Sequence, residues 1–256
     1  YSKLWMNGQK FWMKETVNVI YTDFSKAFDT VPHGRLISKL SGYGIRGKML
    51  TWIGEFLKDR KQRVVVQGEA SSWEWVKSGV PQGSVLGPIL FLIYINDITE
   101  GIKSEAYLFA DDMKLFSRVV DIHSSMVLQN DLDIVMRWTK KWLLSLNIGK
   151  CKVLAMGKGA GSFDYEVDIV SGRVRLERSA LERDLGVQVD SELTFQEHIW
   201  GKVKTANKMV GLIRRNFGEA GAHSLMLIYK AMVRPHLEYA QAVWSPYKVK
   251  LVEALE

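Results

Sequence analysis

The order of five predicted segments constrains the fold of this chain more than its composition does. A run of β-branched and apolar residues at 17–22 predicts a strand, and a glycine-rich loop leads into an apolar helix at 84–98. A hairpin is expected at 105–117, an amphipathic helix at 122–143 and a further strand at 151–156. This order, β-α-β-β-α-β, is that of the split βαβ fold, so we expect an α+β domain with insertions. In that topology the first strand and the hairpin are neighbours at the centre of one sheet.

Two adjacent aspartates, Asp111 and Asp112, stand at the expected tip of the hairpin, within YLFADDMKLF. The expected topology also brings Asp23, at the end of the first strand, towards them. Three carboxylates at one sheet edge repel one another unless cations are present. Mg²⁺ commonly uses one or two carboxylates plus substrate phosphates, and two such ions can stabilise an in-line phosphoryl displacement. Taken alone, an Asp-Asp pair is more typical of a solvated turn.

Charge and cysteine content narrow the class of protein. Lysine and arginine number 35 against 28 acidic residues, a net charge of +7 that suits a polyanionic partner or simply a soluble surface. A single cysteine, Cys151, excludes a disulfide framework and a cysteine-rich zinc site, and indicates a reducing compartment. The longest apolar run, Val85 to Ile95, is too short to cross a bilayer, so no membrane partner is expected.

Further segments extend this core on both sides. We expect a helix near 34–40, a helix at 49–59, strands at 63–67 and 73–77 joined by the turn GEASS, a hairpin at 165–169 and 173–177, and a strand at 184–189. From about residue 197 the pattern becomes helical and basic, with helices expected at 197–216 and 219–233. The sequence therefore predicts two domains, 1–191 and 192–256.

Ordered motifs across essentially the whole chain resemble the reverse transcriptases of non-LTR (LINE-type) retrotransposons. They are YTDFSKAFDTVPH (21–33), SGVPQGSVLGPILFLIYIND (78–97), FADD (109–112), LNIGKCKVLAMG (146–157), ERDLGVQVD (182–190) and VRPHLEYAQAVWSP (233–246). The resemblance is strongest to animal elements that pair an endonuclease with the polymerase. It implies a right-hand polymerase, with a palm and residual fingers elements at 1–191 and a helical thumb at 192–256. Only 22 residues precede Asp23, so most of the fingers are expected to be missing and activity of this chain alone is in question.

The resemblance also implies roles for individual residues. Asp23, Asp111 and Asp112 would be the catalytic ligands of two Mg²⁺ ions, with Mn²⁺ as the alternative ion. The dNTP site would consist of Phe24, Phe28, Pro81, Gln82, Gly83 and Lys150. Phe28 would exclude a ribose 2′-hydroxyl, although its sequence context alone favours an ordinary core residue. Lys150 would lie near the leaving pyrophosphate, with Lys152 as its competitor.

Two further sets of residues would hold nucleic acid. Leu185, Gly186 and Val187 correspond to the primer-gripping hairpin, and a plain strand is the alternative there. The basic residues expected to follow the phosphates of the template–primer duplex are Lys202, Lys204, Lys208, Arg214 and Arg215. Charged helix faces are otherwise simply solvated.

The expected function is that of an RNA-directed DNA polymerase, a nucleotidyltransferase that extends a primer 3′-hydroxyl with dNTPs on an RNA template. An upstream endonuclease domain and a location in nucleus and cytoplasm are expected for the parent element. Two alternatives stay open. One is a non-catalytic, nucleic-acid-binding remnant of a retroelement, and the other is a maturase-like splicing factor that shares the palm.

Overall fold

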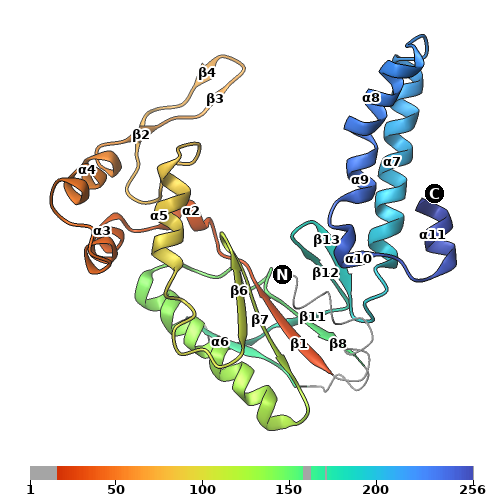
Figure 1. Ribbon diagram of the computed structural model, residues 1–256. Coiled ribbons are helices and arrows are strands. Elements are labelled where there is room, and N and C mark those ends of the chain that lie inside the picture. Colours follow the sequence, from red (N-terminus) through yellow and green to blue (C-terminus); the bar gives the residue numbers. More distant parts are fainter. Residues whose placement is uncertain (1–15, 158–162, 171, 256) are drawn as a thin grey trace.

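A five-stranded mixed sheet forms the centre of the computed structural model, which describes residues 16–157, 163–170 and 172–255 (Figure 1). The strand order is β11-β8-β1-β7-β6, where the strands are β1 (Val17–Thr22), β6 (Glu105–Phe109), β7 (Asp112–Arg118), β8 (Lys152–Met156) and β11 (Glu177–Ser179). β1 is antiparallel to both β7 and β8, and β11 lies parallel to β8. The predicted β-α-β-β-α-β order and the central position of the first strand are confirmed.

Both faces of β1 are buried, which explains its mainly apolar sequence; its polar residues Asn18 and Thr22 are buried as well. Ile20 packs into a core with helices α5 (Leu86–Ile95) and α6 (Ile122–Trp142). Val19 points to the opposite face, where it joins Ile199 of helix α7 (Gln196–Asn216) in a second core. A capping box between Asp121 and Ser124 begins α6. Across the described residues, no helix combines the length and apolar character that a bilayer span requires.

A helical and ribbon-like arm follows β1 in the chain. It contains α2 (Ala27–Thr30), α3 (His33–Gly42), α4 (Gly47–Leu57), and the short strands β2 (Lys61–Gln62), β3 (Val65–Val66), β4 (Glu69–Ala70) and β5 (Glu74–Trp75). The predicted strands at 63–67 and 73–77 are replaced by two short ladders, β2 with β5 and β3 with β4. The chain turns at Gln67 and Gly68, where both φ angles are positive. The prediction of a turn at the GEASS segment is therefore wrong. Figure 1 shows this ribbon projecting away from the sheet.

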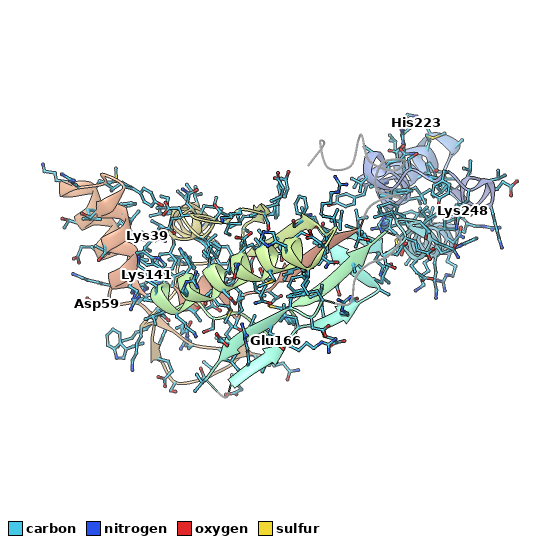
Figure 2. The ribbon with its side chains drawn as sticks, turned by 90° about the horizontal axis from the view of Figure 1, so that it is seen from below. Lys39, Asp59, Lys141, Glu166, His223 and Lys248 are labelled. Atoms are coloured by element: carbon cyan, nitrogen blue, oxygen red, sulfur yellow. The ribbon has the colours of Figure 1, made fainter. Side chains whose placement is uncertain are left out.

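A buried lysine ties this arm to the sheet's helices. Lys39 of α3 donates to the carbonyl of Tyr94 on α5 and pairs with Asp97, while its ammonium lies over the rings of Trp138 and Trp142 on α6. Figure 2 shows Lys39 near one end of α6, on the same side as Lys141. Burial lowers the pKa of the Lys39 ammonium, and its contact with Asp97 opposes that change.

The C-terminal part begins with two hairpins and ends in helices. The hairpins are β9 (Glu166–Ile169) with β10 (Gly172–Arg175), and β12 (Leu181–Asp184) with β13 (Val187–Asp190). The predicted single strand at 184–189 is therefore wrong, because Leu185 and Gly186 take positive φ angles of 44° and 85° and reverse the chain. The helices after α7 are α8 (Ala222–Met232), α9 (Arg234–Glu238), α10 (Gln241–Trp244) and α11 (Val249–Leu255). They form a second arm, where His223 and Lys248 lie in Figure 2.

Candidate active site

Asp23 and Asp112 lie at the same edge of the sheet. The last paired residues of β1 and β7 are Thr22 and Met113, and Thr22 Oγ1 donates to the Met113 carbonyl at 3.0 Å. Asp23 and Asp112 are the next residues beyond this pair, and residues opposite one another on antiparallel strands point to the same face. Both line one small pocket of about 140 Å³. Figure 1 shows this edge of the sheet between the two arms.

Asp111, the third predicted acidic residue, lies in the turn of the hairpin next to Asp112 and is not among the residues that line this pocket. It follows Ala110, whose φ of 53° is in the left-handed region. Desolvation and then the charges of Asp111, Asp23 and Asp184 raise the pKa of the Asp112 carboxyl, with Lys114 opposing them. This edge of the sheet therefore concentrates negative charge, which favours binding of a cation.

The metal-binding role predicted for these aspartates stays a prediction. Within residues 16–157, 163–170 and 172–255, no three or more His, Cys, Asp or Glu side chains form a group that could hold a metal ion. Instead, Lys150 Nζ lies 3.6 Å from Asp23 Oδ2. The carboxylate oxygens still fit a hard cation, because Mg²⁺ commonly takes one or two protein carboxylates and completes its shell with water and phosphate. Lys150, predicted near the pyrophosphate, is thus placed beside the aspartates.

Pro81 and Gln82 of the Pro81-Gln82-Gly83 loop line a different hollow from the pocket that holds Asp23. Gln82 Nε2 donates to Asp29 Oδ1 at 2.9 Å, and both residues line that hollow with Pro81. The preceding Gly79 has a φ of 91°, and a Cβ there would lie 2.7 Å from the Asp29 backbone. The glycine is therefore required for the loop to approach α2. Asp23 and Asp112 thus line one pocket, and Pro81 and Gln82 line another.

The two phenylalanines predicted for the dNTP site differ in burial. Phe24 is buried, and its backbone bridges to Leu146. Phe28 is half-buried and stacks on Phe91 of α5, with ring centroids 4.4 Å apart. Phe24 is thus part of the core, while Phe28 has one ring face packed on the core and part of its surface open.

The Leu185-Gly186-Val187 segment forms the β12–β13 turn and the start of β13. Tyr239 Oη donates to the Leu185 carbonyl at 2.8 Å, so the second arm supports this turn. Val187 is buried in the second core. The alternative of a plain strand is wrong, because the chain reverses here, but contact with a primer stays a prediction.

The predicted phosphate-binding residues all lie on α7, which runs along the second arm. Lys202 is half-buried, with its ammonium 5.6 Å from the centre of the Tyr239 ring. The other four, Lys204, Lys208, Arg214 and Arg215, are exposed. The helix therefore presents a basic surface.

Sequence reasoning missed an ion pair at the centre of the site. Lys114 of β7 pairs with Asp184 of β12, and both side chains are largely buried in the pocket that Asp23 and Asp112 line. The pair joins the aspartate-bearing hairpin to the turn at Leu185. Its only sequence signal was the position of Lys114 two residues after Asp112, which places both on one strand face.

A family comparison decides the class of protein. The family model described as reverse transcriptase (RNA-dependent DNA polymerase) matches residues 9–192. The chain belongs to this reverse transcriptase family. Its mixed α+β fold agrees with that assignment, and the resemblance to LINE-type elements noted in the sequence is confirmed by its relatives.

Two curated relatives are reverse transcriptases of mobile elements. The chain is 30% identical to the RNA-directed DNA polymerase from mobile element jockey of Drosophila funebris, over 91% of this chain and 26% of that protein. It is 27% identical to the probable RNA-directed DNA polymerase from transposon BS of Drosophila melanogaster, over 93% of this chain and 27% of that protein. The chain thus spans about a quarter of the length of these relatives.

A solved structure supports the fold. A telomerase from Candida albicans, in complex with a TWJ fragment of telomeric RNA, aligns with a TM-score of 0.50 and 11% sequence identity. The alignment covers 96% of this chain and 48% of that one. At this identity the likeness concerns the fold alone.

Proposed function

We propose that this chain is the polymerase part of a LINE-type retroelement protein and extends a DNA primer with dNTPs on an RNA template. The observation that carries the proposal is the placement of Asp23 and Asp112 at one sheet edge, with Asp111 in the adjacent turn, in a chain of the reverse transcriptase family. The sheet with α5 and α6 would be the palm. The helices from residue 192 would be the thumb, and the family match ends at that residue.

Each site residue would position or neutralise a part of the substrates. Asp23, Asp111 and Asp112 would hold two Mg²⁺ ions, which when bound supply charge stabilisation for the attacking and leaving oxygens of phosphoryl transfer. Lys150, now paired with Asp23, would turn to the negative charge of the pyrophosphate. Gln82 and the backbone of Gly83 would hydrogen-bond the incoming nucleotide, and Phe28 would exclude a 2′-hydroxyl.

The primer and the duplex would be held by the second arm. The Leu185-Gly186 turn, supported by Tyr239, would hold the primer end so that its 3′-hydroxyl faces the α-phosphate. The basic residues of α7 would neutralise duplex phosphates without reading sequence. The two arms would then contact the template–primer from opposite ends of the sheet.

The test is incorporation of dTTP on a poly(rA)–oligo(dT) template–primer with Mg²⁺. We expect primer extension that requires template, primer and Mg²⁺ together, and that stops when Mg²⁺ is chelated. A chain that binds the template–primer tightly but never extends it would overturn the proposal. That outcome would favour the second candidate, a non-catalytic nucleic-acid-binding remnant.

A further inference from the structure

The ribbon at residues 61–75 carries a group of exposed aromatic and basic side chains that the proposed function does not use. Trp73 and Trp75 are 56% and 55% exposed. Tryptophan is usually largely buried, so two such rings on one thin ribbon call for an explanation. All ribbon residues are exposed, so the ribbon buries no core of its own.

The two tryptophans and two cations share one face of the ribbon. Lys61 is directly opposite Trp75 in the ladder, and its ammonium lies 4.1 Å from the ring centre. The Arg63 guanidinium lies 4.7 Å from the centre of the Trp73 ring. Glu74 pairs with Gln62, so strand alternation directs it to the other face. One face therefore combines aromatic rings with positive charge.

This combination fits a single-stranded polynucleotide. Unpaired bases stack on aromatic side chains regardless of sequence, while nearby cations neutralise the backbone phosphates. A duplex has no free base faces to offer. An acidic protein segment would use the cations but would leave two flat rings without a matching partner.

The ribbon face also continues towards the proposed dNTP site. Lys61 and Trp75 line the same hollow as Pro81 and Gln82. A single-stranded nucleic acid that lies on the ribbon would therefore follow one continuous surface to the loop that would hold the incoming nucleotide.

We propose that the Lys61–Arg63–Trp73–Trp75 face, the ribbon face from here on, binds single-stranded nucleic acid by stacking and phosphate contacts. Because the ribbon face leads to the proposed dNTP site, we assign the bound nucleic-acid strand to template that has not yet been copied. This assignment alone rests on the proposed function. Binding of a single strand to the ribbon face requires neither dNTPs nor metal. Failure of the ribbon proposal and failure of polymerisation are therefore distinguishable.

The test measures binding of labelled oligo(U) and oligo(dT) to the full chain by fluorescence anisotropy, without Mg²⁺ or dNTPs. The Trp73→Ala/Trp75→Ala variant should bind both oligonucleotides at least about tenfold more weakly, given the usual strength of base–aromatic stacking. Trp73→Phe/Trp75→Phe should retain most of the affinity because its rings still stack. Trp52→Ala is the matched control, since Trp52 of α4 is similarly exposed outside the ribbon and should be dispensable.

The cations are tested through the salt dependence of binding. Lys61→Ala/Arg63→Ala should reduce the slope of log K against log salt by about 1.4, roughly 0.7 for each lost single-strand phosphate contact. Arg46→Ala/Lys48→Ala, on an exposed part of the same arm, is the matched control and should keep the slope.

Three results would overturn the proposal. Unchanged single-strand binding in the double tryptophan variant, with an unchanged melting temperature, is the first. An equal loss of affinity for a blunt duplex is the second, because it would exclude stacking. The third is a double tryptophan variant that keeps its nucleic-acid binding but loses self-association, measured by sedimentation. That result would make the ribbon face a protein interface.

Discussion

At the scale of single residues, Phe28 has two possible roles that can be tested against each other: excluding a ribose 2′-hydroxyl, or packing in the core. Its ring stacks on Phe91, yet part of its surface stays open. If the open side lies beneath the incoming sugar, Phe28→Val should raise the ratio of kcat/KM for rNTP over dNTP, because specificity is a ratio of these values. We expect that ratio to rise, together with a loss of stability of roughly 1–3 kcal/mol from the lost packing.

The matched control for this prediction is Phe195→Val. Phe195 is buried in the second core, on the other face of the sheet from Phe28, so its replacement should lower the melting temperature and leave the nucleotide ratio unchanged. If Phe28→Val behaves in the same way, with a lower melting temperature and an unaltered ratio, Phe28 is a core residue and not a gate.

The buried His198 should make the free energy of unfolding depend on pH. It is buried on α7, its Nδ1 accepts from the Gln188 amide, and burial lowers its pKa to about 4. Because the unfolded chain has the ordinary value near 6.5, the unfolded state binds more protons as the pH falls from 6.5 towards 4. This one residue should therefore remove about 2 kcal/mol of unfolding free energy between pH 7 and pH 5.

Urea unfolding at these two pH values measures the effect. His198→Gln should flatten the dependence, because glutamine does not titrate. The same pH dependence in the wild type and the variant would show that His198 is not the group responsible.

At the scale of elements, the junction between α2 and the Pro81 loop depends on one glycine. Gly79 and Gly44 have φ angles of 91° and 90°, but only Gly79 has backbone atoms within reach of an added Cβ. Alanine at either position should cost ~1–2 kcal/mol from the left-handed backbone. Gly79→Ala should lose a further ~1–3 kcal/mol because the loop must move away from Asp29.

Unfolding free energies of the two variants, measured side by side, check this difference. Gly79→Ala should also raise the KM for dNTP, since the loop carries Gln82. Equal losses of unfolding free energy in Gly79→Ala and Gly44→Ala would show that the close approach of residue 79 to Asp29 does not affect stability.

The attachment of the first arm to the sheet is a second property of the elements. Lys39→Met should destabilise the chain by about 3 kcal/mol, because Asp97 keeps a partly buried charge without its cation. Lys141→Met is the control: Lys141 is exposed near the same end of α6, and its loss should stay within about 0.5 kcal/mol. Chemical unfolding that gives similar values for both variants would contradict a structural role for the buried pair.

At the scale of the whole molecule, the sequence predicted the features that depend on local patterns, such as strands and helices, better than the contacts between distant segments. The neighbouring positions of β1 and the β6–β7 hairpin followed from strand and helix periodicities, and Asp111 and Asp112 were correctly placed at the hairpin tip. The edge strand β11 was not predicted as part of this sheet. The residue pattern alone predicted one strand at 184–189 and missed the β12–β13 turn, because Leu185, not a glycine, begins it with a positive φ. The resemblance had implied a hairpin at these residues. The Lys114–Asp184 pair and the aromatic contacts of Lys39 join segments far apart in sequence, so no local pattern could indicate them.

The central claim is that Asp23 and Asp111 act in phosphoryl transfer and not in holding nucleic acid. Primer extension and template–primer binding, measured on the same preparations of Asp23→Asn and Asp111→Asn, test it most directly, with the exposed Asp59→Asn as control. We expect extension to fall by about two orders of magnitude or more in both variants, since charge stabilisation of the transition state is lost. Binding should stay within about threefold, because distributed phosphate contacts carry it. Extension at the wild-type rate in both variants would contradict the claim.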